Sequence, residues 1–169
     1  GEFEAERGLP VGGIGLLLLI ESPAALPLLH DLAGASPRVV AMTLGPEDYS
    51  LAAGCSTDAP ALLGPNLAVA QACAAKGLLP LGFVGSIGDF SDLAAFRLKI
   101  EQARQLGFRG AAVIHPAQVE ILNRGFGPSA DELSWAARVV EAAAAAGEGA
   151  FQLDGRMIDA ASARMAQNV

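Results

Sequence analysis

The chain has 169 residues, of which 52% are hydrophobic, enough apolar material for one folded domain with a full core. Eleven basic against eighteen acidic residues give a net charge of −7, which excludes the basic footprint that nucleic-acid binding needs. The longest apolar stretch, residues 14–20 with Gly15 inside it, is far shorter than the roughly 20 residues that cross a bilayer. No basic leader with a cleavage site opens the chain, so we expect a cytoplasmic protein without nucleic-acid or membrane partners.

Four apolar runs alternate with stretches of helical composition, and this alternation predicts βαβ units around a parallel sheet. The expected strands are residues 14–20, 39–44, 79–84 and 111–114. The expected helices are residues 24–33, 65–76, 93–106, 116–123 and 130–146. The fold class indicated is therefore α/β with parallel strands.

Serine and glycine residues mark the expected helix ends. Starts are indicated at Ser22, Ser91 and Ser129, the last with Glu132 at capping-box spacing. Stops are indicated by glycines at positions 34, 77, 107 and 147. The connection formed by residues 45–64 is long for a βα loop, which usually has about 2–6 residues. A long connection at this edge of a sheet is typical of a functional loop.

The segment after residue 147 has a different character. Residues 151–153 are expected to be extended, Asp154 and Gly155 to form a turn, and a short helix to begin near Asp159. Two cysteines, at position 55 in a loop and at position 73 in an expected helix, lack metal-type spacing. We expect both to be free thiols.

Two acidic residues, Glu21 and Asp48, follow the apolar runs of the first two strands. The carboxyl ends of parallel strands form one rim, where ligand sites collect. Mg²⁺ is usually held by one or two carboxylates together with waters and substrate oxygens, so the pair predicts a magnesium site. Each residue could instead cap the helix that follows it. Glu47 is a weaker candidate, because in an extended backbone its side chain points away from that of Asp48.

His115 is a candidate substrate-binding residue on the same rim. It follows the fourth expected strand, and Pro116 begins a helix whose amino terminus can bind an anion. The alternative is a histidine that only hydrogen-bonds a neighbouring loop. The sequence contains no Ser/His/Asp or Cys/His nucleophile signature, no P-loop and no G-x-G-x-x-G. An anionic substrate would therefore need a metal or helix amino termini.

Four phrases of the sequence resemble the citrate lyase beta-subunit family, which lies in the HpcH/HpaI aldolase group with malyl-CoA and citramalyl-CoA lyases. They are LLLLIES, MTLGPEDYSLAAG, LGFRGAAVIHPAQVEILNRGFGPS and FQLDGRMIDA. The resemblance implies a (β/α)8 barrel of the TIM type with a C-terminal extension. It also implies a Mg²⁺ enzyme, with Mn²⁺ as a substitute, that cleaves or forms a carbon–carbon bond between an acyl-CoA and an oxo acid.

The resemblance also implies roles for individual residues. Glu21 and Asp48 match the two metal-binding carboxylates, and the backbone at Gly45 and Pro46 matches the part that holds the substrate carboxylate. Asp159 matches an aspartate of the C-terminal extension that reaches the active site of an adjacent subunit as an acid/base group. The alternative for Asp159 is that it only caps the helix that follows it. Two alanines follow it where family members often carry a residue and then proline.

The matching phrases correspond to the second half of the family barrel. We therefore expect residues 1–147 to form a partial (β/α) barrel domain and residues 148–169 to form the C-terminal extension. The first four strands of the family barrel, with an arginine that binds substrate or CoA phosphates, have no counterpart here. Either the chain is a fragment, or it completes a barrel with another chain. A half-barrel exposes two sheet edges, so we expect a homo-oligomer or an incomplete barrel.

The leading hypothesis is a Mg²⁺-dependent carbon–carbon lyase acting on 3-hydroxyacyl-CoA acids of the malyl, citramalyl or citryl type. One alternative is a thioesterase for the same acyl-CoA class, because the metal would polarise the substrate equally well for attack by water. A second alternative is an assembly module without catalytic activity. The most conservative alternative is an open α/β domain that binds no metal.

Overall fold

The computed structural model describes residues 1–57, 60–86, 88, 91–147 and 149–169. Contacts within the chain divide it into two units, Gly1–Phe126 and Gly127–Val169. In the described part of the chain, no helix has both the length and the apolarity needed to cross a membrane.

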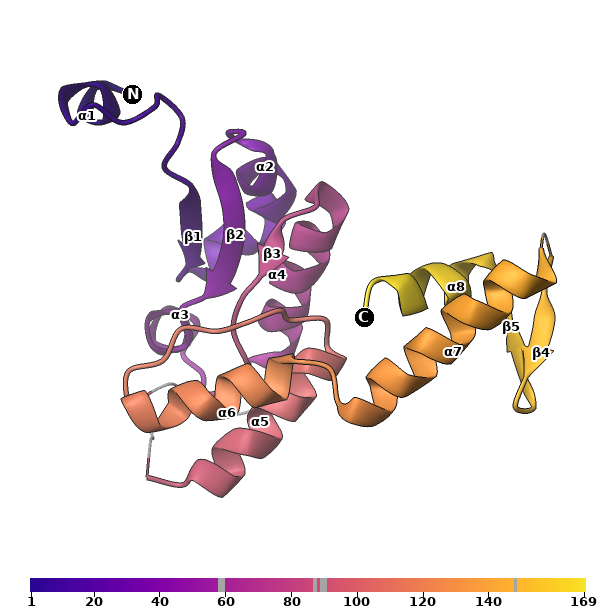
Figure 1. Ribbon diagram of the computed structural model, residues 1–169. Coiled ribbons are helices and arrows are strands. Elements are labelled where there is room, and N and C mark those ends of the chain that lie inside the picture. Colours follow the sequence, from indigo (N-terminus) through magenta and orange to yellow (C-terminus); the bar gives the residue numbers. More distant parts are fainter. Residues whose placement is uncertain (58–59, 87, 89–90, 148) are drawn as a thin grey trace. The chain divides into compact units, whose positions relative to one another are not determined.

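The first unit is built on a parallel sheet with the strand order β1-β2-β3 (Figure 1). These strands are β1 at Leu16–Ile20, β2 at Val39–Leu44 and β3 at Leu79–Pro80. Their runs of aliphatic residues are typical of strands in an α/β layer. The register pairs Ile20 with Leu44, so the first two strands end level with each other. The expectation of parallel strands in an α/β fold is confirmed.

The fourth expected strand, residues 111–114, is wrong. The chain there keeps one isolated bridge, between Leu81 and Gly110, where the N–H of Gly82 donates to the carbonyl of Gly110 at 2.8 Å. Gly82 has φ +130°, a conformation that glycine adopts and other residues avoid. This turns the chain out of the strand direction directly after β3. Among the described residues, no strand pairs with residues 111–114.

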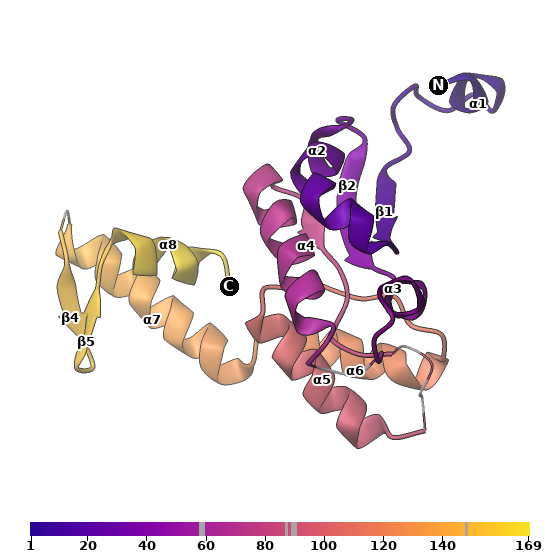
Figure 2. The same ribbon diagram turned by 180° about the vertical axis from the view of Figure 1, so that it is seen from behind.

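Helices α2 and α4 cover one face of the sheet, as seen from behind in Figure 2. The core between them contains Met42, Val69 and Cys73, whose side chains are fully buried. The helical elements of this unit are α1 at Glu2–Glu6, the 3₁₀ helix η1 at Pro23–Leu28, α2 at Leu29–Gly34, α3 at Pro46–Ala53, α4 at Leu63–Lys76, α5 at Leu93–Gln105 and α6 at Pro116–Phe126.

Helix α3 lies inside the connection that the sequence suggested was a loop, so that expectation is wrong. Pro46 is its first residue, a position where proline is favoured because its fixed φ suits a helix and its missing N–H is not needed. The helix ends at Gly54 with φ 65°, a left-handed stop that glycine provides. A short helix therefore follows β2 directly, and its first turn stands at the carboxyl end of the sheet.

Helices α5 and α6 pack closely where Gly125 meets Ile100. A Cβ atom placed on Gly125 would lie 2.5 Å from Cγ2 of Ile100, and the Ile100 side chain is fully buried. Phe83 and Phe96 extend the same apolar cluster, with an edge-to-face contact at 5.4 Å between ring centroids. Ile100 is β-branched and confined, so it has little freedom to move aside.

Replacing Gly125 with Ala should therefore destabilise the first unit. Overpacking of this kind typically lowers the free energy of unfolding by about 1–3 kcal/mol. Urea unfolding followed by far-ultraviolet circular dichroism measures the change. Gly64→Ala in α4 is the matched control, because nothing lies within 4 Å of a Cβ placed there and alanine favours a helix. Equal unfolding midpoints for the wild-type chain and Gly125→Ala would contradict the close packing.

The expected helix starts are confirmed at two of three positions. Ser129 and Glu132 form the capping box: the Ser129 N–H donates to Oε2 of Glu132 at 2.8 Å, and the Glu132 N–H donates to Oγ of Ser129 at 3.2 Å. Ser22 caps η1. The expected start at Ser91 is wrong by one residue, because Asp92 caps α5 by accepting from two backbone N–H groups. Both residue types suit this position, so composition does not separate them.

The second unit contains a long helix, a hairpin and a short helix. The hairpin turns at Asp154, with φ 48°, and Gly155, with φ 76°, as two-residue turns between antiparallel strands require. Its elements are α7 at Ala130–Ala146, β4 at Phe151–Leu153, β5 at Arg156–Ile158 and α8 at Ala160–Gln167. The extended segment, the turn and the last helix are thus confirmed.

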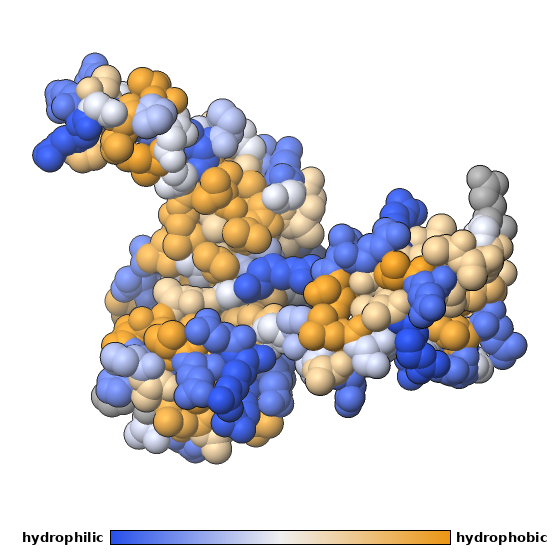
Figure 3. Space-filling view, viewed as in Figure 1, coloured by the Kyte–Doolittle hydropathy of each residue, from blue (hydrophilic) through white to orange (hydrophobic). Residues whose placement is uncertain are grey.

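The face of the sheet opposite α2 and α4 carries exposed leucines. Alternate residues of a strand point to opposite faces, and Leu18 and Ile20 of β1 pack into the core. Leu17 and Leu19 therefore point the other way, and they are 49% and 54% exposed. Figure 3 shows apolar side chains gathered over β1. In the described part of the chain, β1 pairs with β2 alone.

Candidate functional site

Glu21 and Gly45 meet at the carboxyl end of the sheet. They are the residues directly after Ile20 and Leu44, which the register pairs, and the Gly45 N–H donates to the Ile20 carbonyl at 2.9 Å. A Cβ atom placed on Gly45 would lie 2.7 Å from Cγ and 3.0 Å from Oε1 of Glu21. The Glu21 side chain therefore crosses the α-carbon of Gly45, in space that only glycine leaves open.

Both predicted metal ligands line one cavity of about 230 Å³. Glu21 enters from the end of β1, and Asp48 enters from the first turn of α3. Gly45 and Pro46, the predicted carboxylate-binding positions, line the same cavity. The other described residues that line it are Leu19, Thr43, Leu44, Glu47, Gly82, Phe83, Gly85 and Ala112. The structure thus brings together four of the six predicted site residues.

Glu47 also lines this cavity, although the sequence made it a weaker candidate for the metal site than Asp48. The expectation assumed an extended backbone, whereas Glu47 and Asp48 are consecutive in the first turn of α3. The hydroxyl of Ser86 donates to Oε1 of Glu47 at 2.7 Å. This bond joins α3 to the loop after β3 and fixes one side of the cavity. The proline at the start of a helix was the available signal, since it favours a helical first turn.

The cavity suits a cation that accepts few protein ligands. Among the residues that the structure describes, no group of three or more His, Cys, Asp or Glu side chains could share one ion. Mg²⁺ does not need such a group, because it keeps several waters and takes one or two carboxylates plus substrate oxygens. The carboxylates of Glu21 and Asp48 provide such a pair within one cavity. These residues therefore fit a Mg²⁺ ion.

His115 caps helix α6. Its Nδ1 atom accepts from the N–H of Ala117 at 3.2 Å, and its own N–H donates to Oε1 of Gln118 at 3.2 Å. His115 is not among the residues that line the cavity of Glu21 and Asp48. Its role in substrate binding stays a prediction.

Asp159 belongs to the second unit and caps α8. Its Oδ1 atom accepts from the N–H of Ser162 at 2.7 Å. This backbone hydrogen bond, aided by one from the Ser162 side chain, lowers the pKa of Asp159 below its ordinary value. Asp159 therefore caps α8, which is the alternative that the sequence left open. If Asp159 also has the proposed acid/base role, it has that role as an ionised carboxylate near neutral pH.

The cap at Asp159 predicts a pH dependence. Because the folded pKa is lowered, the cap stabilises α8 above the unfolded pKa of about 4 and is lost as the pH falls through the folded value. The amide ¹⁵N shift of Ser162 should follow this titration. Asp159→Asn is the matched control, because asparagine caps helices equally well without a charge. A titration that persists in this variant would assign it to another group.

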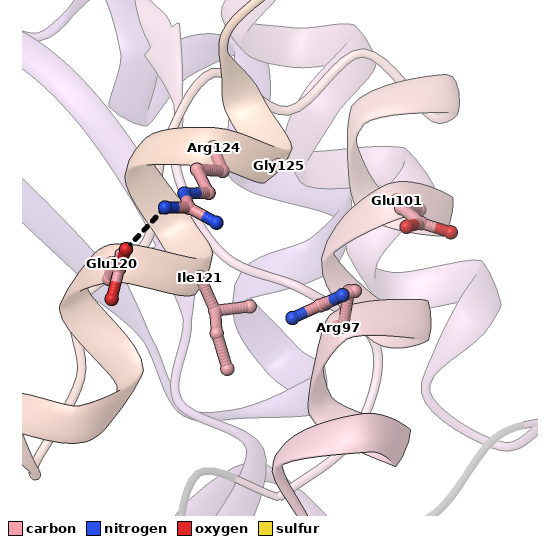
Figure 4. A pocket seen from close by; sticks show the side chains of 6 residues that line it. All are labelled: Arg97, Glu101, Glu120, Ile121, Arg124 and Gly125. Carbon is pink, nitrogen blue, oxygen red and sulfur yellow. Dashed lines mark ion pairs between the residues drawn. The ribbon is translucent and has the colours of Figure 1, made fainter.

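A second cavity, of about 290 Å³, lies between α5 and α6 (Figure 4). Arg124 and Glu120 form an ion pair there at 2.6 Å. Both side chains are largely exposed, and exposed pairs of this kind contribute little to stability. The described residues that line this cavity include none of the predicted site residues. The carboxylate cavity at the end of the sheet is therefore the candidate functional site.

Known proteins resemble this chain in sequence. The family model described as HpcH/HpaI aldolase/citrate lyase matches residues 2–116. Citrate lyase subunit beta of Escherichia coli (strain K12) is 36% identical over 162 residues, 93% of this chain and 53% of that protein. L-malyl-CoA/beta-methylmalyl-CoA lyase of Cereibacter sphaeroides (strain ATCC 17025) is 34% identical over 172 residues, 89% of this chain and 54% of that protein. The chain spans about half the length of these relatives.

Solved structures resemble it in fold. A citrate lyase from Burkholderia xenovorans LB400 matches with a TM-score of 0.85 at 26% identity, over 99% of this chain and 55% of that one. CitE from Mycobacterium tuberculosis, in complex with magnesium, acetoacetate and coenzyme A, matches with a TM-score of 0.77 at 26% identity, over 90% of this chain and 58% of that one. The expected fold class, a partial (β/α) barrel, is confirmed. The family model covers more than half of the sequence, and the chain belongs to the HpcH/HpaI aldolase/citrate lyase family.

Proposed function

We propose that this chain carries the metal and substrate face of a Mg²⁺-dependent carbon–carbon lyase. The substrates would be 3-hydroxyacyl-CoA acids, and the products an acyl-CoA and an oxo acid. The observation that carries the proposal is that Glu21 and Asp48 line one cavity at the carboxyl end of paired parallel strands. The names of the relatives, citrate lyase subunit beta and L-malyl-CoA/beta-methylmalyl-CoA lyase, support this class of reaction.

The residues of the cavity have distinct parts in this proposal. Glu21 and Asp48 would hold the ion, which as a Lewis acid polarises the oxygen that becomes the carbonyl of the oxo acid. Gly45 keeps open the space that the Glu21 side chain occupies. The amino terminus of α3, beginning at Pro46, directs its positive end toward a substrate carboxylate.

In the proposed reaction, the substrate hydroxyl passes its proton to the ionised carboxylate of Asp159 and the adjacent carbon–carbon bond breaks. The electron pair of that bond stays on the carbon next to the thioester, and this carbon then takes up a proton to give the acyl-CoA. We assign the proton at this carbon to Asp159, contributed by a neighbouring copy of the chain in an oligomer, which returns the proton that it took from the hydroxyl. Its lowered pKa keeps this carboxylate ionised near neutral pH, so it can accept a proton in either direction of the reaction.

Product analysis tests the proposal. The chain is incubated with Mg²⁺ and separately with malyl-CoA, citramalyl-CoA and citryl-CoA, and the products are identified by mass spectrometry. A shorter acyl-CoA together with an oxo acid, in equal amounts and dependent on Mg²⁺, supports a lyase. Free CoA with an intact hydroxy acid would show hydrolysis instead. Absence of turnover from an oligomer that binds Mg²⁺ would show an assembly module.

A further inference from the structure

Lys99 lies on the buried face of helix α5. That face is formed by Phe96, Ile100 and Ala103, whose side chains are almost completely buried. Lys99 follows Phe96 by three positions and precedes Ala103 by four, so it shares their side of the helix. Its side chain is partly buried.

The ammonium group of Lys99 lies beside Gly85, a residue that lines the carboxylate cavity. A Cβ atom placed on Gly85 would lie 3.2 Å from Nζ and 3.5 Å from Cε of Lys99. The end of the lysine side chain therefore fills the space beside the Gly85 α-carbon. Gly85 lines the same cavity as Glu21 and Asp48. A side chain at position 85 would separate the lysine from this cavity.

The charges of the residues that line the cavity indicate a role for the Lys99 ammonium group. The described lining contains three carboxylates, of Glu21, Glu47 and Asp48, and no basic side chain. A positive group beside the cavity would favour the binding of an anionic substrate there. Lys99 makes no ion pair or hydrogen bond within the described ranges of the chain. An ammonium group without an ion pair is available to an incoming anion.

The amino terminus of α3 gives a second reason to expect a positive side chain that binds a carboxylate at this cavity. The first N–H groups of a helix are available to an anion. Pro46 occupies the first position of α3 and has no N–H to donate. The amino terminus at this cavity therefore offers one donor fewer to a carboxylate than a helix that begins with another residue. A positive side chain across the cavity would replace that donor.

We propose that Lys99 binds a carboxylate of the oxo-acid part of the substrate at the Gly85 side of the cavity. The identity of the anion rests on the proposed lyase function, whereas the position of the cation rests on α5 and Gly85. Lys99 is thus a substrate-binding residue whose contribution is to affinity for the oxo acid. Binding of the metal ion does not require it.

The sequence offers a matched control. Lys76 and Lys99 are the only lysines in it. Lys76 also ends beside a glycine, with Nζ 3.5 Å from a Cβ placed on Gly34, but Gly34 and Lys76 are not among the residues that line the cavity. Reductive ¹³C-methylation gives each lysine its own NMR signal, which Lys76→Arg and Lys99→Arg assign. Pyruvate and glyoxylate, each added with and without Mg²⁺, are the probes.

We expect the Lys99 signal to shift saturably with these oxo acids and the Lys76 signal to stay unchanged. The dissociation constant of the oxo acid should rise by about 10- to 100-fold in Lys99→Met, the effect of losing a charge-assisted hydrogen bond. Lys76→Met should leave it unchanged, and Lys99→Arg should retain most of the affinity. Thermal unfolding of Lys99→Met establishes that the variant folds.

An unmoved Lys99 signal, or equal oxo-acid affinity in Lys99→Met and the wild-type chain, would overturn the proposal. The failure of the lyase function is a separate result. If no thioester is cleaved but the Lys99 signal still responds to oxo acids, the result supports the proposed Lys99 site and contradicts the proposed lyase reaction. If thioesters are cleaved and Lys99→Met keeps its oxo-acid affinity, the result supports the proposed lyase reaction and contradicts the proposed Lys99 site.

Discussion

Changing Asp48 to Asn should weaken Mg²⁺ binding by more than about 100-fold, because loss of even an outer-shell partner of a metal site weakens binding by roughly 10- to 100-fold. The side chain keeps its shape and loses its charge, so the fold should persist. Asp48 lies in the first turn of α3, where a neutral amide still accepts hydrogen bonds from the backbone. Calorimetric titration of Mg²⁺ into the chain and the variant measures the loss.

Asp31→Asn is the control for charge alone. Asp31 lies on α2 and is exposed, and it is not among the residues that line the cavity. The Asp31→Asn variant should bind Mg²⁺ as tightly as the wild-type chain does. Cleavage of thioesters should fall with metal occupancy in Asp48→Asn and remain unchanged in Asp31→Asn. Unaltered Mg²⁺ affinity in Asp48→Asn would remove this residue from the proposed metal site.

Replacing Gly45 with Ala should also abolish tight Mg²⁺ binding, although no charge is lost. The new Cβ would lie 2.7 Å from Cγ of Glu21, and because Glu21 is an exposed and flexible side chain, it would swing out of the cavity. Gly45 has φ −88° and ψ 94°, which alanine also adopts. The free energy of unfolding should therefore change by less than about 1 kcal/mol.

Gly45→Ser separates the two roles of this position. Gly45 is the N-cap residue of α3, and serine restores a good N-cap while keeping the obstructing Cβ. We expect Gly45→Ser to match the wild-type chain in thermal stability and to match Gly45→Ala in weakened Mg²⁺ binding. If Gly45→Ser binds Mg²⁺ as tightly as the wild-type chain does, the contact between position 45 and Glu21 has no part in the metal site.

The parts of the fold that sequence patterns predicted well are those in which local signals agree. The runs in β1 and β2 are apolar on both faces, and Gly77 ends α4 with a left-handed φ of 68°. The hydrophobic pattern and the helix-ending glycine therefore indicate the same elements. The fourth strand failed because a strand needs a partner. Gly82 has a positive φ in the neighbouring segment, and a run of two alanines followed by valine and isoleucine does not reveal whether a partner strand exists.

The candidate site was predictable to the extent that it follows from strand order. Residues directly after two paired parallel strands must come together, and this placed Glu21 beside Gly45. The rest depends on contacts between distant segments. The bond from Ser86 to Glu47 joins residues 39 positions apart, and Lys99 on α5 lies beside Gly85, which is outside that helix. No local pattern specifies either contact.

The exposed edge of β1 has a practical consequence for the protein in solution. Leu17 and Leu19 leave apolar surface next to unpaired strand groups, a combination that promotes association with other chains. Association that favours the folded state raises apparent stability by mass action. We therefore expect the melting temperature of this chain to rise with protein concentration, and variants should be compared at equal molarity.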